Sequence, residues 1–101
     1  MWKLVCEATF EDDEDLPRSI KDLGKLRWNP ETLPSREDMA NMIREAILGT
    51  GYDGMPVFIH YVRNSHYYWF AVCDQEMETV QLEFRLVEVR GGEWADTRGE
   101  A

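Results

Sequence analysis

The sequence predicts an α+β fold of order β-α-α-β-β-β, a four-stranded, largely antiparallel sheet with two helices packed on one face. Three observations predict it: an alternating segment at the N-terminus, two segments of helical periodicity after it, and three strand-like segments joined by short turns. The 101 residues, 44% of them hydrophobic, have the size and composition of a single domain, 1–101, with 91–101 as a loose C-terminal tail.

The first predicted strand covers residues 2–10, where large or apolar side chains alternate with smaller or charged ones. This period of two is typical of a strand with one buried face. An uninterrupted acidic run follows the strand and ends it, because neighbouring carboxylates repel one another and have poor strand propensity. The run comprises Glu11, Asp12, Asp13, Glu14 and Asp15.

A short helix is predicted next, with Asp15 as its N-cap and Pro17 near its first helical position. The acidic run would then lie at the positive end of the helix dipole. The segment 29–34 contains two prolines and is predicted to be a loop.

The second helix has the clearest local signals. Ser35 starts a Ser-x-x-Asp capping pattern, and an apolar stripe with helical spacing runs from Met39 to Ile47. Gly49 is predicted to end the helix. The glycines of 49–54 follow a helix instead of a strand and have no lysine among them, so this segment is predicted to be a turn and not a phosphate site.

The remaining chain predicts strands at 57–62, 66–73 and 79–89, joined by turns at 63–65 and 74–77. The first two of these strands are apolar on both faces, and aromatic residues crowd into them, including Tyr67 and Trp69. Two short helices cover only one face of such a sheet. We expect the other face to be closed by Trp28, Trp94 or the 29–34 loop, by a second copy, or by a partner.

The charge balance indicates what kind of partner to expect. Twenty acidic against 11 basic residues give a net charge of -9. Direct binding to nucleic acid or to an anionic membrane is disfavoured, because both depend on lysine and arginine, and a basic protein surface is the natural complement. Only two cysteines, no signal peptide and no apolar run of about 20 residues predict a cytoplasmic protein.

Residues capable of chemistry are few. Cys6, His60, His66, Cys73 and Asp74 are the candidate metal ligands, but they show none of the paired spacings of zinc sites, and no metal or cofactor is predicted. A Cys73–His60 nucleophile pair would need positive charge beside the thiol, which a strand in an acidic protein does not offer. The acidic run lacks the spacing of a calcium-binding EF-hand loop.

These observations favour a non-enzymatic binding protein that occupies a basic surface of its partner. The concrete version is an inhibitor of a nucleic-acid-binding machine, by analogy of size and charge with phage-encoded anti-defence proteins (anti-CRISPR or anti-restriction). Its predicted contact residues are Glu11, Asp12, Asp13, Glu14 and Asp15, with Tyr67 and Trp69 as aromatic anchors. The alternatives are a self-associating domain, such as a homodimer, and a small enzyme or ligand-binding module that uses Cys73, His60 or His66.

Overall fold

The computed structural model describes residues 1–61 and 67–89. It contains four strands, β1 (Trp2–Ala8), β2 (Val57–His60), β3 (Trp69–Asp74) and β4 (Thr79–Glu88), and two α-helices, α1 (Arg18–Leu23) and α2 (Arg36–Ile47). Two short 3-10 helices, η1 (Asp13–Asp15) and η2 (Pro30–Thr32), lie in the connections before and after α1. The predicted fold class and element order are confirmed.

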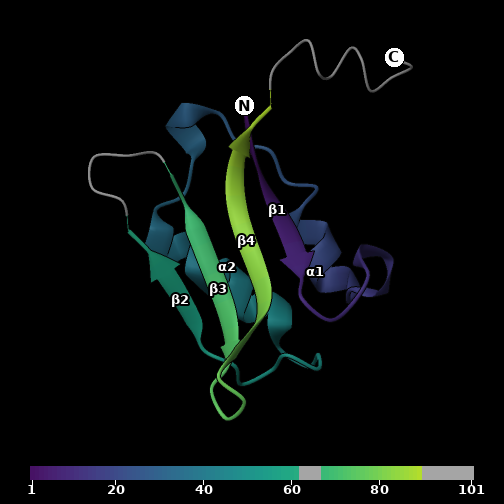
Figure 1. Cartoon of the computed structure of the whole chain (residues 1–101). Coiled ribbons are helices and arrows are strands. Elements are labelled where there is room, and N and C mark those ends of the chain that lie inside the picture. The colour runs from purple at the N-terminus through teal and green to yellow at the C-terminus, as the bar shows by residue number, and fades with distance from the viewer. Residues whose placement is uncertain (62–66, 90–101) are drawn as a thin grey trace.

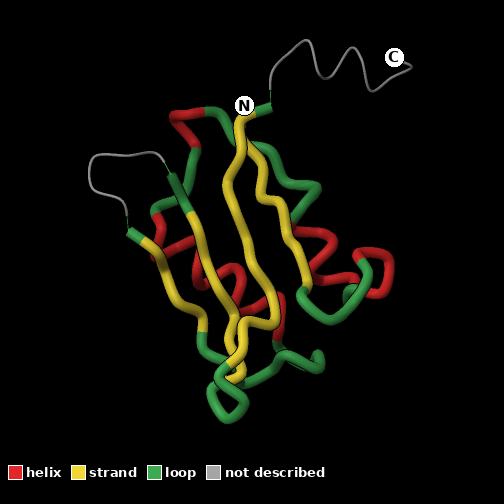
Figure 2. Tube along the Cα trace, viewed as in Figure 1, coloured by secondary structure: helices red, strands yellow, loops and turns green. Residues whose placement is uncertain are grey.

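The four strands form one antiparallel sheet in the order β1-β4-β3-β2. Both helices lie on the same side of it, so the opposite face points toward the viewer in Figure 1. The tube in Figure 2 shows the same two layers, the strands in front and the helical segments behind. The last strand in the sequence, β4, is therefore central, and the edges are formed by β1 and β2.

The core lies between the sheet and the helices. Alternate residues of each strand enter it, as the period of two predicts, and meet the apolar stripe of α2. The largest fully buried side chains are Phe70, Phe84, Leu4, Ile20, Met39, Ile43, Leu82 and Val72. These residues come from the strands β1, β3 and β4 and from both helices, so the core holds both layers together.

The helix signals were partly confirmed. Ser35 caps α2, because its hydroxyl accepts a hydrogen bond from the Asp38 amide at 3.1 Å, and Gly49 adopts a positive φ of 75° just after the helix. The start of the first helix was predicted wrongly. Pro17 is itself the N-cap residue of α1, and Asp15 instead ends the 3-10 turn η1, whose formation within the acidic run the sequence did not reveal.

The described strands are shorter than the predicted ones. β1 ends at Ala8, β2 ends at His60 and β3 begins at Trp69. The predicted turn at 63–65, His66 and the tail 91–101 lie outside the described residues. A register shift between Val72 and Cys73 interrupts the pairing of β3 with β4.

Trp28 and the 29–34 loop, the described segments proposed to close the second face of the sheet, lie on its other side. Trp28 forms a bridge with Trp2 at the β1 edge and packs against the core, on the side of the helices. The loop 29–34 also lies on that side, where Leu33 packs on the core and Tyr68 donates a hydrogen bond to the Pro34 carbonyl. Trp94 lies outside the described residues.

Candidate interaction site

The acidic run emerges from the end of β1 and stays on the surface. All five residues from Glu11 to Asp15 are exposed. Glu11 is held in place by the hydroxyl of Tyr52, a buried residue, which donates a hydrogen bond to its carboxylate. Burial, together with this hydrogen bond, raises the pKa of Tyr52, so the tyrosine remains a donor at neutral pH.

The fold adds two further connections to the same end of the sheet. β1 and β3 end there, whereas β2 and β4 begin there, so the segments 9–17, 48–56 and 75–78 all leave or enter the sheet at this end. In Figure 1 the turn 75–78 is lowest, and 9–17 curves away beyond β1 beside α1. We call these three segments, with Asp74, the acidic end. Its acidic residues outside the run are Asp53, Asp74, Glu76 and Glu78. The sequence did not reveal this grouping, because 38 positions separate Asp15 from Asp53.

No ion pair within residues 1–61 and 67–89 neutralises the carboxylates of the acidic end. The ion pairs between described residues join Lys25 to Asp22 at 3.2 Å and Arg85 to Glu7 at 3.0 Å, and neither involves the acidic end. Lys21 reaches the run but donates to the backbone carbonyl of Glu14. The negative charge therefore remains available to a partner.

Apolar side chains are exposed among these carboxylates. Phe10 lies between β1 and the acidic run, and 66% of it is exposed, while Met77 in the β3–β4 turn is 68% exposed. The Thr9 amide donates to the Gln81 carbonyl, so Phe10 follows next in register beside Val80, another exposed residue. Sequence reasoning missed Phe10 as a contact residue because the strand pattern assigned it to the buried face.

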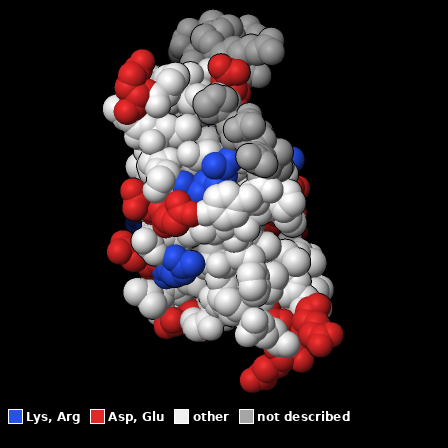
Figure 3. Space-filling model, turned by 90° about the vertical axis from the view of Figure 1, so that its left-hand side faces the viewer, with Lys and Arg blue, Asp and Glu red and all other residues white. Residues whose placement is uncertain are grey.

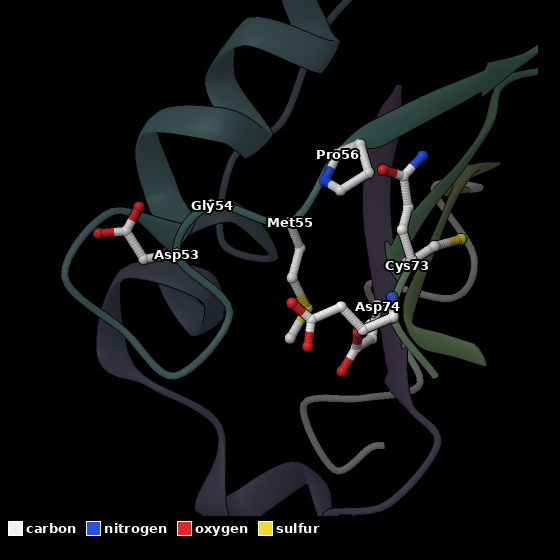
Figure 4. Close-up of a pocket in the computed structure, with 8 residues that line it drawn as sticks. Asp53, Gly54, Met55, Pro56, Cys73 and Asp74 are labelled. Atoms are coloured by element: carbon white, nitrogen blue, oxygen red, sulfur yellow. Dashed lines mark hydrogen bonds between the residues drawn. The ribbon is translucent and has the colours of Figure 1, made fainter. Parts of the chain in front are cut away.

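An open pocket of about 290 Å³ lies at the acidic end, between residues 53–56 and 73–76. Figure 4 shows Asp53 and Asp74 on opposite sides of it, with Met55 between them. The Asp74 carboxylate accepts the backbone amides of Glu76 and Met77 at 3.0 and 3.3 Å, which holds the turn in shape. The lining supplies acceptor groups and a thioether, but no basic side chain.

The two predicted aromatic anchors lie elsewhere. Tyr67 is 42% exposed and Trp69 is half-buried, and both pack edge-on against His60, with ring centroids 6.0 and 5.0 Å away. Trp69 begins β3 at the end of the sheet opposite to the acidic end. The predicted contact residues therefore form two separate surfaces instead of one.

Cys73 and His60, which were considered for catalysis, are also separated, while His66 lies outside the described residues. His60 pairs with Trp69, whereas Cys73 pairs with Pro56, so about 13 Å of strand lies between the imidazole and the thiol. Cys6 is a free thiol on β1. Burial, with added repulsion from Asp13 and Glu7, raises the pKa of Cys6 to about 12, which keeps it protonated at neutral pH.

Among residues 1–61 and 67–89, no three His, Cys, Asp or Glu side chains are grouped so that they could hold a metal ion. None of the helices described is long and apolar enough to cross a membrane. No protein-family model matches the chain, and neither a curated protein nor a solved structure shows detectable similarity to it. The residues and their arrangement are therefore the basis for any functional conclusion.

Proposed function

We propose that the chain is a non-enzymatic binding protein whose acidic end occupies a basic surface of a partner protein. The observation that carries this proposal is the convergence of three connections on one end of the sheet, with exposed carboxylates that no described base pairs. Exposed Phe10 and Met77 add apolar contacts within the same surface. A charged surface with apolar anchors gives both long-range attraction and short-range affinity.

The most concrete partner is a protein that binds nucleic acid. Such a protein presents lysine and arginine side chains in positions that suit phosphates, and carboxylates in loops of a small rigid domain are able to take those positions. The chain would then act as an inhibitor by competing with nucleic acid for the partner's surface. Anti-defence proteins encoded by phages are the functional class with this character.

A non-enzymatic role is supported by the placement of the chemical groups. The Cys73 and His60 pair needed for a nucleophile is separated along the strands. The pocket at the acidic end contains Cys73, but its sulfur points away from Asp74 and Met55 in Figure 4. Binding through surface charge needs none of these groups.

The proposal is tested by affinity capture from host lysate with the immobilised chain, at about 50 and about 300 mM salt. We expect the captured protein to be released by salt, to be displaced by duplex DNA, and to bind less to the triple variant Asp12→Asn, Asp13→Asn, Glu14→Gln. The matched control, Glu31→Gln, Asp38→Asn, Glu45→Gln, removes the same charge away from the acidic end and should leave capture unchanged. Capture that resists salt and both variants equally would contradict the proposal.

A further inference from the structure

The two edges of the sheet differ in how their backbone groups are used. At the β1 edge, the Trp2 amide donates to the Trp28 carbonyl at 2.7 Å, and the Trp28 amide donates back at 3.0 Å. This isolated bridge engages the outward groups of Trp2, at the start of β1. No described segment lies along the outer side of β2 in Figure 1.

The hydrogen-bond alternation shows which groups of β2 point outward. The Cys73 amide donates to the Pro56 carbonyl at 3.2 Å, so Phe58 and His60, two and four residues further on, also bond to β3. The amide and carbonyl groups of Val57, Ile59 and Tyr61 therefore point away from the sheet. No hydrogen bond between described residues engages them. An edge of this kind is a template for one more strand.

Apolar surface gathers at the same edge. Phe58 is 47% exposed and Tyr61 is 58% exposed, and exposed Tyr67 lies beside His60. Figure 3 looks directly onto this side of the molecule and shows a largely uncharged surface with Lys and Arg atoms near its middle, while most Asp and Glu atoms lie toward the rim. The acidic run lies at the far edge of the sheet, beyond β1. Charge repulsion between two chains is therefore weaker at β2 than at the acidic end.

We propose that β2 pairs with β2 of a second copy of this chain, antiparallel, about a twofold axis at Ile59. This register places Ile59 opposite Ile59 of the other copy and Val57 opposite its Tyr61, which gives about six hydrogen bonds between the copies. On the uncovered face, Phe58 lies opposite His60 of the other copy, a cross-strand aromatic pair. The two sheets become one continuous sheet without an open β2 edge.

Charge complementarity on α2 favours a second copy over another occupant. Glu37 and Arg44 are both exposed and lie seven residues apart, which puts them on one face of the helix. Glu37 accepts a hydrogen bond from Tyr61, so this face adjoins β2. The twofold axis runs the two α2 helices antiparallel, and Glu37 of each copy then lies opposite Arg44 of the other. The same axis sends the two acidic ends to opposite ends of the joined sheet.

This dimer goes beyond the proposed function and does not depend on it. The β2 edge and the acidic end are separate surfaces, so a failure of self-association leaves the binding of a basic partner intact, and the reverse also holds. A dimer would present two acidic ends that point in opposite directions.

Sedimentation equilibrium of the full chain over a range of micromolar concentrations tests the proposal. We expect a reversible dimer, weakened about tenfold or more by Glu37→Arg and by Arg44→Glu, since symmetry repeats each like-charge contact twice. The double variant exchanges both charges and should restore association to within about threefold of the native chain. Glu45→Arg makes the same charge change elsewhere on α2 and should have no effect.

Hydrogen exchange locates the interface independently of these variants. The amides of Val57 and Ile59 should exchange slowly at high chain concentration and fast on dilution, while the amides of Phe58 and His60 stay protected throughout by β3. A chain that remains monomeric at several hundred micromolar, or a dimer in which the edge amides exchange freely, would overturn the proposal. Protection of Val57 and Ile59 only after a different protein is added would show that another strand takes this edge, which also overturns it.

Discussion

Individual side chains at the end of β1 show how position in the fold sets their chemistry. Glu11 belongs to a solvent-exposed run, yet it is held by the hydroxyl of the buried Tyr52. The thiol of Cys6 is partly withdrawn from water and is repelled in its ionised form by the carboxylates of Asp13 and Glu7. The sequence predicted that the strand around Cys73 offers no positive charge to stabilise a thiolate. The contact between residues 11 and 52 needs the folded chain.

The raised pKa of Cys6 predicts a slow reaction with alkylating reagents. Folding favours the protonated thiol, so its contribution to stability is present below pH 9 and is lost as the pH rises toward the folded-state pKa of about 12. In the Cys73→Ser variant, which leaves Cys6 as the reactive thiol, we expect alkylation at pH 8 to be at least about tenfold slower than in the denatured chain.

The Cys6→Ser variant is the matched control and reports Cys73 by the same measurement. The Cys6 rate should rise with pH well beyond the value at which an ordinary thiol is fully ionised. A folded-state rate equal to that of the denatured chain would show that Cys6 is accessible and ionises normally.

Secondary-structure elements were predicted best where the local sequence pattern favours the same structure as the packing of the core. Ser35, the apolar stripe and Gly49 define α2 from residues close together in the sequence, and the structure uses each of them. The start of α1 was predicted less well because three acidic residues before it are equally suited to a cap or to a 3-10 turn. The outcome depended on Leu16 and Ile20, which both enter the core.

The backbone conformation of Gly49, just after α2, leads to a prediction about stability. Its φ of 75° suits glycine, and a Cβ there would meet no atom within 4 Å, so Gly49→Ala tests the backbone conformation alone. We expect the free energy of unfolding to fall by about 1 kcal/mol, measured by urea denaturation. Gly51 is equally open but does not have a positive φ, so Gly51→Ala should cost much less. Equal losses for the two variants would contradict this explanation.

The acidic surface and the exposed aromatic surface lie in different parts of the molecule. The acidic end carries exposed carboxylates from three connections, whereas the β2 edge carries exposed aromatic rings and unused backbone groups. The sequence predicted both an acidic surface and an aromatic one but combined them into a single site. They are distinct because Tyr67 lies just before β3 and Trp69 begins it, at the opposite end of the sheet and two strands away from β1.

Self-repulsion at a net charge of -9 predicts that salt stabilises the native state. We expect the thermal midpoint to rise between about 20 and about 300 mM NaCl, because screening weakens repulsion within the acidic end more than it weakens the two exposed ion pairs. The Asp12→Asn, Asp13→Asn, Glu14→Gln variant should show a smaller rise. A midpoint that falls with salt in the native chain would mean that favourable ion pairs outweigh the repulsion.

The sequence by itself determined the fold class, the order of the elements and the excess of negative charge. These properties depend on periodicity, capping residues and composition, which act over a few neighbouring positions. Only the tertiary structure decided that β4 is central, that Asp53, Asp74, Glu76 and Glu78 lie at the end of the sheet where the acidic run begins, and that β2 is an edge strand. Those outcomes depend on the pairing of strands distant in sequence, where packing between layers selects one arrangement among several that the local patterns allow.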